Sequence, residues 1–238
     1  MTTPNLAAPE PIAVTLPSTE RLRQAFACGA VDLPAGTQVF RAVRHPAAVI
    51  PPFVERTYRF GPPAEFAGPD GRFATYWMYA AQDLTTALWE SGFCTNDMMQ
   101  PGTFYIPPGI AEGGLIATFT LKADIQVLDL AGTVLSKLGI YDQIHGEHAW
   151  CQWFGLRMLE LLAGFRGDTA PVGFRYPSRK HKSHLALAVQ SSSLETWRRL
   201  VDVQVKPFAG MPEFAKGASA PNTCSGDCHQ IRYLVATR

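Results

Sequence analysis

The irregular order of strand-like and helix-like segments is the feature that most constrains the fold of this chain. Segments with the alternation or the β-branched and aromatic content of strands lie at residues 37–43, 75–80, 114–121, 125–130, 172–178, 184–190, 201–205 and 231–237. Helix-like segments lie at 20–27, 84–91, 133–138, 147–164 and after 192–195. Because the helices do not follow the strands in regular alternation, this order favours an α+β fold over a doubly wound parallel sheet.

The length and composition of the chain are typical of a single domain. With 238 residues, of which 47% are hydrophobic and 17% charged, the chain can bury a sizeable core and is too apolar to be disordered. Residues 1–17 are broken by prolines and are expected to form a loose arm. We therefore expect one domain over residues 18–238.

Charge, cysteine content and hydropathy exclude several classes of protein. A formal net charge of +1 gives no basic field for phosphate neutralisation, so direct binding of nucleic acid is not expected. The odd, scattered set of cysteines is typical of reduced thiols: Cys28, Cys94, Cys151, Cys224 and Cys228. The first twenty residues contain no Lys or Arg, unlike a signal peptide, and no apolar run approaches the roughly 18–20 residues of a membrane span. We expect a cytoplasmic protein without a membrane partner.

Residues 75–91, TYWMYAAQDLTTALWES, predict a strand that turns directly into a short helix. The first half alternates aromatic and smaller residues, as pleated strands do. Asp83 is well placed to cap a helix over residues 84–91. Glu90 lies beside the apolar face of that helix, so its carboxylate belongs either to a solvated flank or to the edge of a pocket.

Motifs of several common enzyme classes are absent from the sequence. It contains no G-x-S-x-G elbow, no P-loop and no G-x-G-x-x-G. HGEH (145–148), HKSH (181–184) and CSGDCH (224–229) do not combine into the two ligand pairs of a structural zinc site. We therefore expect no metal and no resident cofactor.

A set of polar residues lies at the ends of apolar segments: Arg41, Arg59, Tyr79, Glu90 and Ser178. Taken singly, each has a simpler explanation. An arginine at a strand end is usually a surface ion pair, a strand tyrosine usually belongs to the core or its rim, and a helix glutamate or a turn serine is usually solvated. The meaning of the set therefore depends on its order along the chain.

In the order FRA, YRF, YAAQDLTTALWE and GFRYPSR, these segments resemble the RES domain, a bacterial family named for its Arg, Glu and Ser. The similarity covers about residues 37–190, some two-thirds of the chain, and leaves out the N-terminal arm and the region after about 195. The resemblance implies a catalytic domain similar to the ADP-ribosyltransferase fold, with a central mixed or antiparallel sheet flanked by helices. The studied family members are toxins that degrade NAD⁺ by phosphorolysis or hydrolysis of the nicotinamide–ribose bond.

The resemblance also assigns roles to matching residues. Arg41 and Arg59 match the family's two arginines and would bind the diphosphate of NAD⁺, because the planar guanidinium donates two parallel hydrogen bonds. Glu90 matches the helix glutamate. It would stabilise the positive charge that develops on the ribose as the glycosidic bond breaks.

The remaining roles fall to the strand tyrosine and the late serine. Tyr79, with its neighbours Tyr76 and Trp77, would offer π-faces to the cationic nicotinamide ring. Ser178 would orient phosphate or the attacking water, or bond the nicotinamide amide. The basic run at 179–182 either recruits phosphate or an acidic partner or is a solvated face.

One departure from the family pattern concerns the second arginine. In the family it commonly follows glycine in a G-R-[FW] element, whereas Tyr58 precedes Arg59. The segment Gly71–Phe73 has the expected letters, but Arg72 lies only seven residues before Tyr79. We expect Arg59 to be the second substrate-binding arginine, with Arg72 as the rival.

The sequence leaves several alternatives open. NAD⁺ is expected as a substrate, with either water or inorganic phosphate as the acceptor. The same bond cleavage would serve an ADP-ribosyltransferase that modifies a macromolecule, and a non-catalytic domain that binds NAD⁺ or a partner is a further alternative. A neutralising protein is expected as partner, either an Xre-type antitoxin or the immunity protein of an exported effector.

Overall fold

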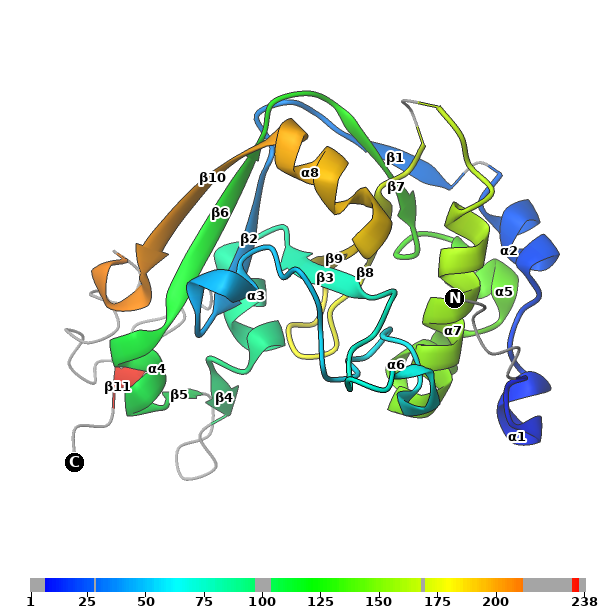
Figure 1. Cartoon of the computed structure of the whole chain (residues 1–238), viewed down its shortest axis with the longest axis horizontal. Coiled ribbons are helices and arrows are strands. Elements are labelled where there is room, and N and C mark those ends of the chain that lie inside the picture. Colours follow the sequence, from blue (N-terminus) through cyan, green and yellow to red (C-terminus); the bar gives the residue numbers. More distant parts are fainter. Residues whose placement is uncertain (1–6, 28, 97–103, 168–169, 212–232, 236–238) are drawn as a thin grey trace, which may run out of the picture.

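An eight-stranded mixed sheet forms the centre of the structure, in the order β1-β7-β8-β9-β3-β2-β6-β10 (Figure 1). The computed structural model describes residues 7–27, 29–96, 104–167, 170–211 and 233–235. The strands are β1 (Ala30–Leu33), β2 (Gln38–Val43), β3 (Trp77–Ala81), β6 (Leu115–Leu121), β7 (Ile125–Asp129), β8 (Gly173–Pro177), β9 (Leu185–Gln190) and β10 (Val201–Pro207). Strands β7 and β8 run parallel, and the other neighbours are antiparallel.

Helices cover both faces of this curled sheet (Figure 1). They are α1 (Glu10–Ala13), α2 (Thr19–Ala25), α3 (Leu84–Ser91), α4 (Pro108–Gly113), α5 (Val134–Leu138), α6 (Tyr141–His145), α7 (His148–Leu162) and α8 (Leu194–Leu200). The short 3-10 helices are η1 (Pro46–Ala48), η2 (Ala64–Phe66), η3 (Ser191–Ser193) and η4 (Phe208–Gly210). The expected α+β class, with a mixed sheet flanked by helices, is confirmed.

A second, three-stranded sheet has the order β11-β5-β4. Its strands are β4 (Thr95–Asn96), β5 (Phe104–Ile106) and β11 (Tyr233–Val235). Strand β11 pairs in parallel with β5, which brings a C-terminal segment beside a segment from the middle of the chain. The sequence predicted a strand at 231–237 but did not indicate that it belongs to a separate sheet.

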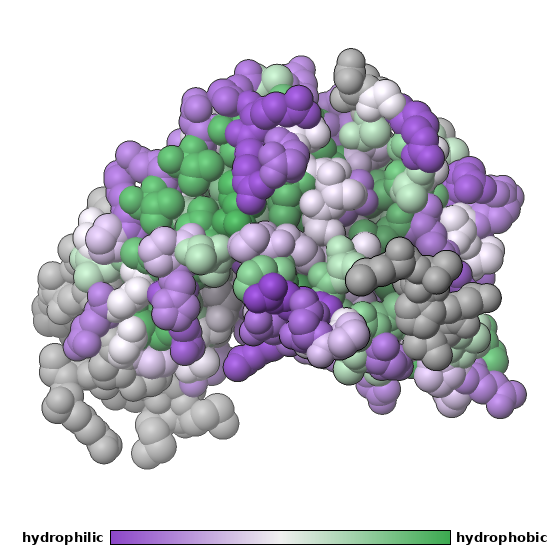
Figure 2. All heavy atoms as spheres, viewed as in Figure 1, coloured by the Kyte–Doolittle hydropathy of each residue, from purple (hydrophilic) through white to green (hydrophobic). Residues whose placement is uncertain are grey.

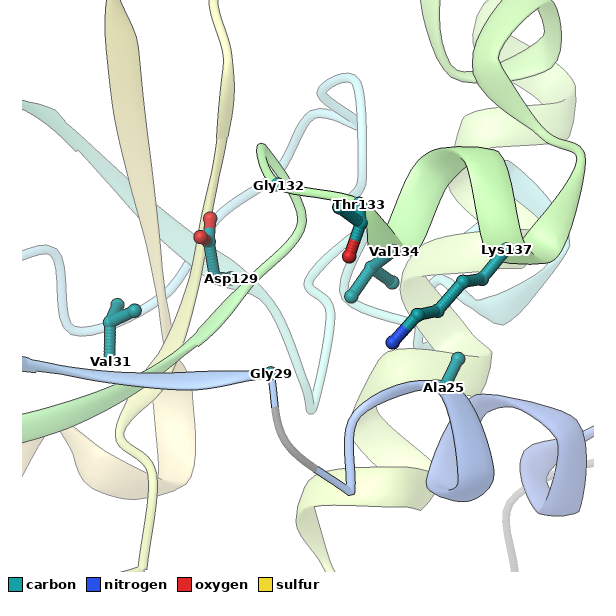
Figure 3. A pocket seen from close by; sticks show the side chains of 8 residues that line it. All are labelled: Ala25, Gly29, Val31, Asp129, Gly132, Thr133, Val134 and Lys137. Carbon is teal, nitrogen blue, oxygen red and sulfur yellow. The ribbon is translucent and has the colours of Figure 1, made fainter.

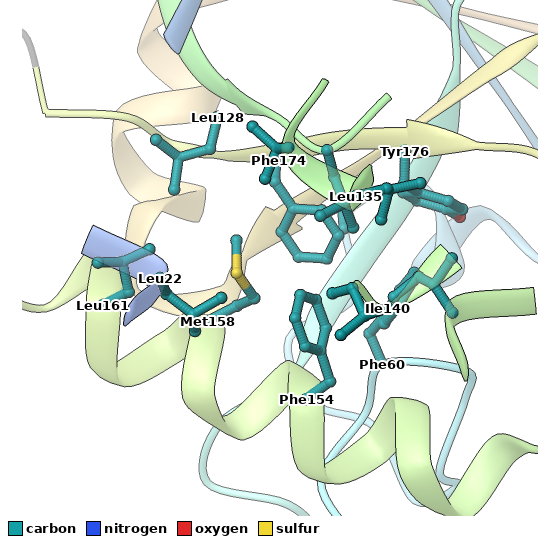
Figure 4. Close-up of a cluster of buried hydrophobic side chains, with 14 of the residues drawn as sticks. Leu22, Phe60, Leu128, Leu135, Ile140, Phe154, Met158, Leu161, Phe174 and Tyr176 are labelled. Atoms are coloured by element: carbon teal, nitrogen blue, oxygen red, sulfur yellow. The ribbon is translucent and has the colours of Figure 1, made fainter. Parts of the chain in front are cut away.

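Two buried clusters lie on opposite faces of the central sheet. The first joins β3, β8 and β9 to α2, α5 and α7, with Phe154, Met158 and Phe174 at its centre (Figure 4). The second lies under α8, where Trp197 packs edge-on against Phe119 at a ring separation of 5.7 Å. A third cluster packs α3 and α4 against the ends of β2 and β6. The helix expected within 147–164 forms as α7, and Trp150, Phe154, Met158 and Leu161 on it belong to the first cluster.

The strand-to-helix unit forms as its sequence predicts. The Oδ1 atom of Asp83 accepts a hydrogen bond from the Thr86 N–H at 2.8 Å and so caps α3. Gly92 follows the helix with φ 74°, a left-handed conformation that costs glycine little. On α3, Ala87 and Leu88 are buried and Glu90 is half-buried. Glu90 thus borders the packed face of α3, as expected.

Several elements were missed because their sequence signals are weak. Strand β1, α4 and α6 are each only four to six residues long, which is too short to show a clear period. Part of the expected N-terminal arm forms α1, and Ile12 and Leu16 pack against the first core cluster. The helix expected after 192–195 forms as α8, which begins after Ser193 without a side-chain cap.

The surface is mostly polar, with apolar side chains exposed over the β10 side of the sheet (Figure 2). Val203 and Val205 on this edge strand are each 42% exposed. None of the described helices is long and apolar enough to cross a membrane. Cys94 and Cys151 are buried free thiols, whereas Cys28, Cys224 and Cys228 lie outside the described residues.

Candidate functional site

Strands β2 and β3 separate near the middle of the central sheet. They share a single residue pair, Phe40 with Ala81, whereas β2 pairs with β6 along its whole length. Beyond that pair the Tyr79 carbonyl has no strand partner on the β2 side. The Arg41 guanidinium takes this place, with Nη1 donating to Tyr79 O at 2.5 Å and Nε to Ala48 O at 3.0 Å. Arg41 is therefore fixed where the sheet opens.

Burial sets the electrostatic state of Arg41. Desolvation lowers its pKa to about 10, while the phenols of Tyr58, Tyr79 and Tyr176 act in the opposite direction. The guanidinium stays charged at neutral pH. Because the carbonyls of Ala48 and Tyr79 are neutral, this charge is stabilised by dipoles rather than by a carboxylate.

Arg59 lies in the long loop before β3, on the side of Tyr79 opposite Arg41. Its side chain is only 7% exposed and donates to the carbonyls of Ile144 and Pro177, the latter at 3.5 Å. Its guanidinium carbon lies 5.3 Å from the centre of the Tyr176 ring. Its buried Nε atom has no hydrogen-bond partner. Arg59 thus brings a second positive charge to the same face of the sheet.

Tyr79 and Tyr176 link the two arginines. Their ring centres are 6.4 Å apart and nearly perpendicular, and the Tyr79 hydroxyl accepts the Phe60 N–H at 3.0 Å. Burial raises the pKa of both phenols, and the neighbouring Arg59 guanidinium opposes this shift. Both residues are therefore neutral hydrogen-bonding groups at neutral pH.

Glu90 and Ser178 meet although they are 88 residues apart in the chain. The Ser178 hydroxyl donates to Glu90 Oε1 at 2.5 Å and accepts the His181 backbone N–H at 2.9 Å. Burial is the main cause that raises the pKa of Tyr176, and the negative charge of Glu90 is the second. The Glu90 carboxylate therefore lies near that phenol. Ser178 is 3% exposed, and its single proton is directed at Glu90. It orients the carboxylate and is not positioned as a nucleophile.

Residues after Ser178 add positive charge to this site. Arg179 Nη1 donates to Gly146 O at 3.0 Å, and Nη2 lies 2.6 Å from His148 Nε2. Lys180 Nζ donates to the backbone carbonyl of Glu90 at 3.4 Å. Burial, followed by the charges of Arg179, Arg59 and Lys180, lowers the pKa of His148. The basic run is therefore not only a solvated face.

The cations around Glu90 outnumber the anions. Among the described residues, no carboxylate forms an ion pair with Arg41, Arg59, Arg179 or Lys180. Within the described ranges, Glu90 is the acidic side chain that contacts this group, through Ser178 and close to Tyr176. Such an excess of positive charge on buried or half-buried arginines attracts an anion that can accept several hydrogen bonds.

The structure brings together all five of the residues that the sequence selected: Arg41, Arg59, Tyr79, Glu90 and Ser178. The rival Arg72 lies elsewhere in its loop, where it approaches Glu55 at 3.8 Å and stacks over Phe53. Sequence reasoning missed Tyr176. It lies two residues before Ser178 at the end of β8, and residues at this spacing point to the same face of a strand. The strand alternation YPS was the signal that could have found it.

The prediction that Tyr76, Trp77 and Tyr79 together offer aromatic faces to the nicotinamide ring is wrong for Tyr76 and Trp77. Trp77 is 2% exposed and belongs to the first core cluster. Tyr76 is 6% exposed, lies in the second cluster on the opposite face of the sheet, and donates its hydroxyl to Pro51 O at 2.6 Å. Because side chains alternate along a strand, Tyr76 cannot share a face with Tyr79. Tyr79 alone borders the site.

A separate hollow of about 230 Å³ lies on another part of the molecule (Figure 3). Residues from the α2–β1 region, β7 and α5 line it, including Asp129 and Lys137. The Asp129 carboxylate is already bonded by both Arg175 Nε and Nη2, each at 2.8 Å. The carboxylate that lines this hollow is therefore already paired within the protein.

The chain matches no family model, no curated protein and no solved structure. The arrangement of the site itself therefore carries the argument about function.

Proposed function

We propose that this protein is an NAD⁺-degrading enzyme of the RES type that cleaves the nicotinamide–ribose bond. The observation that carries the proposal is the hydrogen bond between Ser178 and Glu90, set beside two guanidinium groups without carboxylate partners. An enzyme that cleaves NAD⁺ needs a carboxylate to stabilise the cationic transition state. It also needs positive charges to bind the diphosphate. NAD⁺ is the substrate and not a resident cofactor.

The arginines suit the diphosphate of NAD⁺. Arg41 and Arg59 flank Tyr79, and a guanidinium binds phosphate oxygens through parallel charge-assisted hydrogen bonds. Arg41 uses Nε and Nη1 on carbonyls, which leaves Nη2 as its remaining donor nitrogen. Binding at these fixed charges would position the ribose before the chemical step.

Glu90 suits the bond-breaking step. As the glycosidic bond breaks, positive charge builds on the ribose carbon, and a preorganised carboxylate lowers the energy of that state. The Ser178 hydroxyl holds Glu90 Oε1, and among the described residues no donor occupies Oε2. The free oxygen is available to the ribose.

The decisive experiment measures nicotinamide released from NAD⁺ by the purified full chain. Turnover is expected for the wild-type protein, and a folded protein that leaves NAD⁺ intact would contradict the proposal. Parallel reactions with and without inorganic phosphate separate the acceptors, because phosphorolysis yields ADP-ribose-1″-phosphate and hydrolysis yields ADP-ribose. Label transferred from NAD⁺ to protein or nucleic acid would instead identify an ADP-ribosyltransferase.

The proposed activity also requires a neutralising partner. An enzyme that consumes NAD⁺ in the cytoplasm would harm its own cell, so we propose a cognate protein that blocks the site, either an Xre-type antitoxin or an immunity protein. Co-expression with the protein encoded by the neighbouring gene should restore growth of cells that produce the wild-type enzyme. Growth that is unaffected by the enzyme alone would count against this part of the proposal.

A further inference from the structure

A second polar cluster lies at the opposite end of α3 from Glu90. Asp83, at the start of α3, meets His181 and His184 from the turn between β8 and β9. The potential ligand atoms of these three residues all lie within 4.8 Å of one another. We propose that Asp83, His181 and His184 bind a divalent transition-metal ion of the zinc class.

The fold brings the three side chains together from two distant segments. Asp83 is held by its capping bond to the Thr86 N–H. On the turn, Ser183 has φ 68°, a conformation that is uncommon for residues other than glycine. This turn stacks the two imidazole rings with centres 3.7 Å apart and planes 13° apart. Two neutral rings at this separation are compatible, whereas two charged rings would repel each other.

Hydrogen bonds already connect the three potential ligands to one another and to Thr86. The Thr86 hydroxyl gives its single proton to Asp83 Oδ2 at 2.7 Å, so His181 Nδ1 must donate to Thr86 Oγ1, also at 2.7 Å. His184 Nδ1 lies within hydrogen-bond distance of the same Asp83 oxygen. The cluster therefore offers a carboxylate and two imidazole rings at one place on the surface.

The ligand atoms lie close enough for a zinc-sized ion once the two stacked rings turn so that their in-plane nitrogen lone pairs point to one position. His184 Nδ1 lies 3.1 Å from Asp83 Oδ2. Ligands bound at roughly 2.0–2.1 Å in a tetrahedral site are about 3.3 Å apart, so this edge is already formed. His181 would leave the Thr86 hydroxyl and His184 would give up its hydrogen bond to Asp83, with the ring proton of each histidine carried on Nε2. The side chains of His184 and Asp83 are 45% and 37% exposed, which gives the ion access and leaves room for a water as fourth ligand.

The ion would join two parts of the candidate site. Asp83 caps α3 and Glu90 lies in its last turn, and the backbone N–H of His181 donates to Ser178 Oγ. A metal at this position would fix the turn that carries Ser178 against the helix that carries Glu90. The metal proposal itself does not depend on NAD⁺ cleavage, because its test measures only zinc.

The test uses the full chain with Cys224→Ser and Cys228→Ser, because C-x3-C-H at 224–229 is a second possible zinc ligand set. Zinc is added at pH 7.5, free ion is removed by dialysis, and bound zinc is counted by mass spectrometry. Titration calorimetry with Zn²⁺ alone gives the affinity. One equivalent of zinc is expected.

Variants locate the site. His181→Ala combined with His184→Ala should abolish binding, whereas His145→Ala combined with His148→Ala removes the other spaced histidine pair and should retain it. Asp83→Asn keeps a capping side chain and should weaken zinc binding by about 10–100-fold or more. Circular dichroism confirms that each variant is folded. Zinc bound equally well without His181 and His184, or no zinc bound by the parent protein at pH 7.5, would overturn the proposal.

Discussion

Two neighbourhoods in this protein place arginines and carboxylates in opposite ways. Between β7 and β8, Arg175 and Asp129 form a two-pronged ion pair with both nitrogen–oxygen distances at 2.8 Å. Around Glu90, Arg41 and Arg59 donate to backbone carbonyls, and the carboxylate receives a neutral hydroxyl from Ser178. The arginine charge is thus paired with a carboxylate between β7 and β8, whereas the arginine charges around Glu90 have no carboxylate partner.

The difference separates a structural contact from a candidate binding site. A half-buried ion pair with complete hydrogen bonds is satisfied within the fold, so it needs no ligand. Buried guanidinium groups without an anion are less favourable in the free protein and become favourable when an anion binds. The comparison therefore predicts that substitutions in the first neighbourhood change stability, whereas substitutions in the second change activity.

The largest expected effect is on turnover in Glu90→Gln. Glutamine keeps the size of the side chain and can still accept the Ser178 hydroxyl, but it removes the negative charge. The rate of nicotinamide release should fall by about 10²–10³-fold, with little change in the urea midpoint of unfolding. Glu65→Gln is the matched control, because Glu65 is exposed on η2. Equal losses of activity in both variants would break the comparison.

A pair of arginine variants tests the comparison directly. Arg41→Gln should raise the KM for NAD⁺ by about 10–100-fold, since charge-assisted hydrogen bonds contribute roughly 1.5–3 kcal/mol each. Arg175→Gln should leave KM unchanged and lower the free energy of unfolding by about 1–3 kcal/mol, because Asp129 loses its charged partner. Steady-state kinetics and urea unfolding are measured on both proteins. If Arg41→Gln destabilises the fold without changing KM, Arg41 is a structural residue.

The ion pair also predicts a dependence of stability on pH. Burial alone would raise the pKa of Asp129, but hydrogen bonds from Arg175 and from backbone N–H groups outweigh it and lower the pKa. A lowered folded-state pKa gives stability that is complete above the unfolded value of about 4 and is lost as the pH falls through the folded value. Urea unfolding from pH 6 to pH 2.5 should show this loss, and Asp129→Asn should reduce the slope. An unchanged slope would mean that Arg175 does not hold this carboxylate in solution.

The smallest expected effect is that of Arg72→Gln. Arg72 is an exposed loop residue with ion-pair distances of 3.8 and 4.0 Å, and such surface pairs contribute about 0–1 kcal/mol. Both KM and the unfolding midpoint should stay close to the wild-type values. A large rise in KM would transfer the role of the second substrate-binding arginine from Arg59 to Arg72.

Local sequence signals predicted most of the regular elements. The capping residue Asp83, the terminating Gly92 and the apolar positions of α3 are short-range features, and they gave this helix correct bounds. The strands of the central sheet other than β1 were found in the same way, from their alternation and their β-branched and aromatic content. Short elements such as β1 and α6 escaped because four or five residues show no clear period.

Long-range contacts were beyond such reasoning. The aromatic run at residues 76–79 predicted one platform, but pleating sends Tyr76 and Tyr79 to opposite faces and buries Trp77 in the core. The histidine spacing at 181–184 predicted no metal site, because the carboxylate beside it comes from Asp83, far away in the chain. Strand alternation alone could have separated Tyr76 from Tyr79, whereas the sequence offered no direct sign that Asp83 lies beside the two histidines.

By itself, the sequence determined which residues carry charge, where most helices and strands begin and end, and that the chain forms an α+β domain. These properties depend on neighbours within a few residues along the chain. Only the tertiary structure decided that Ser178 bonds Glu90 and that Arg41 fills the opening between β2 and β3. Both contacts arise from sheet order and helix packing, which depend on many distant residues at once.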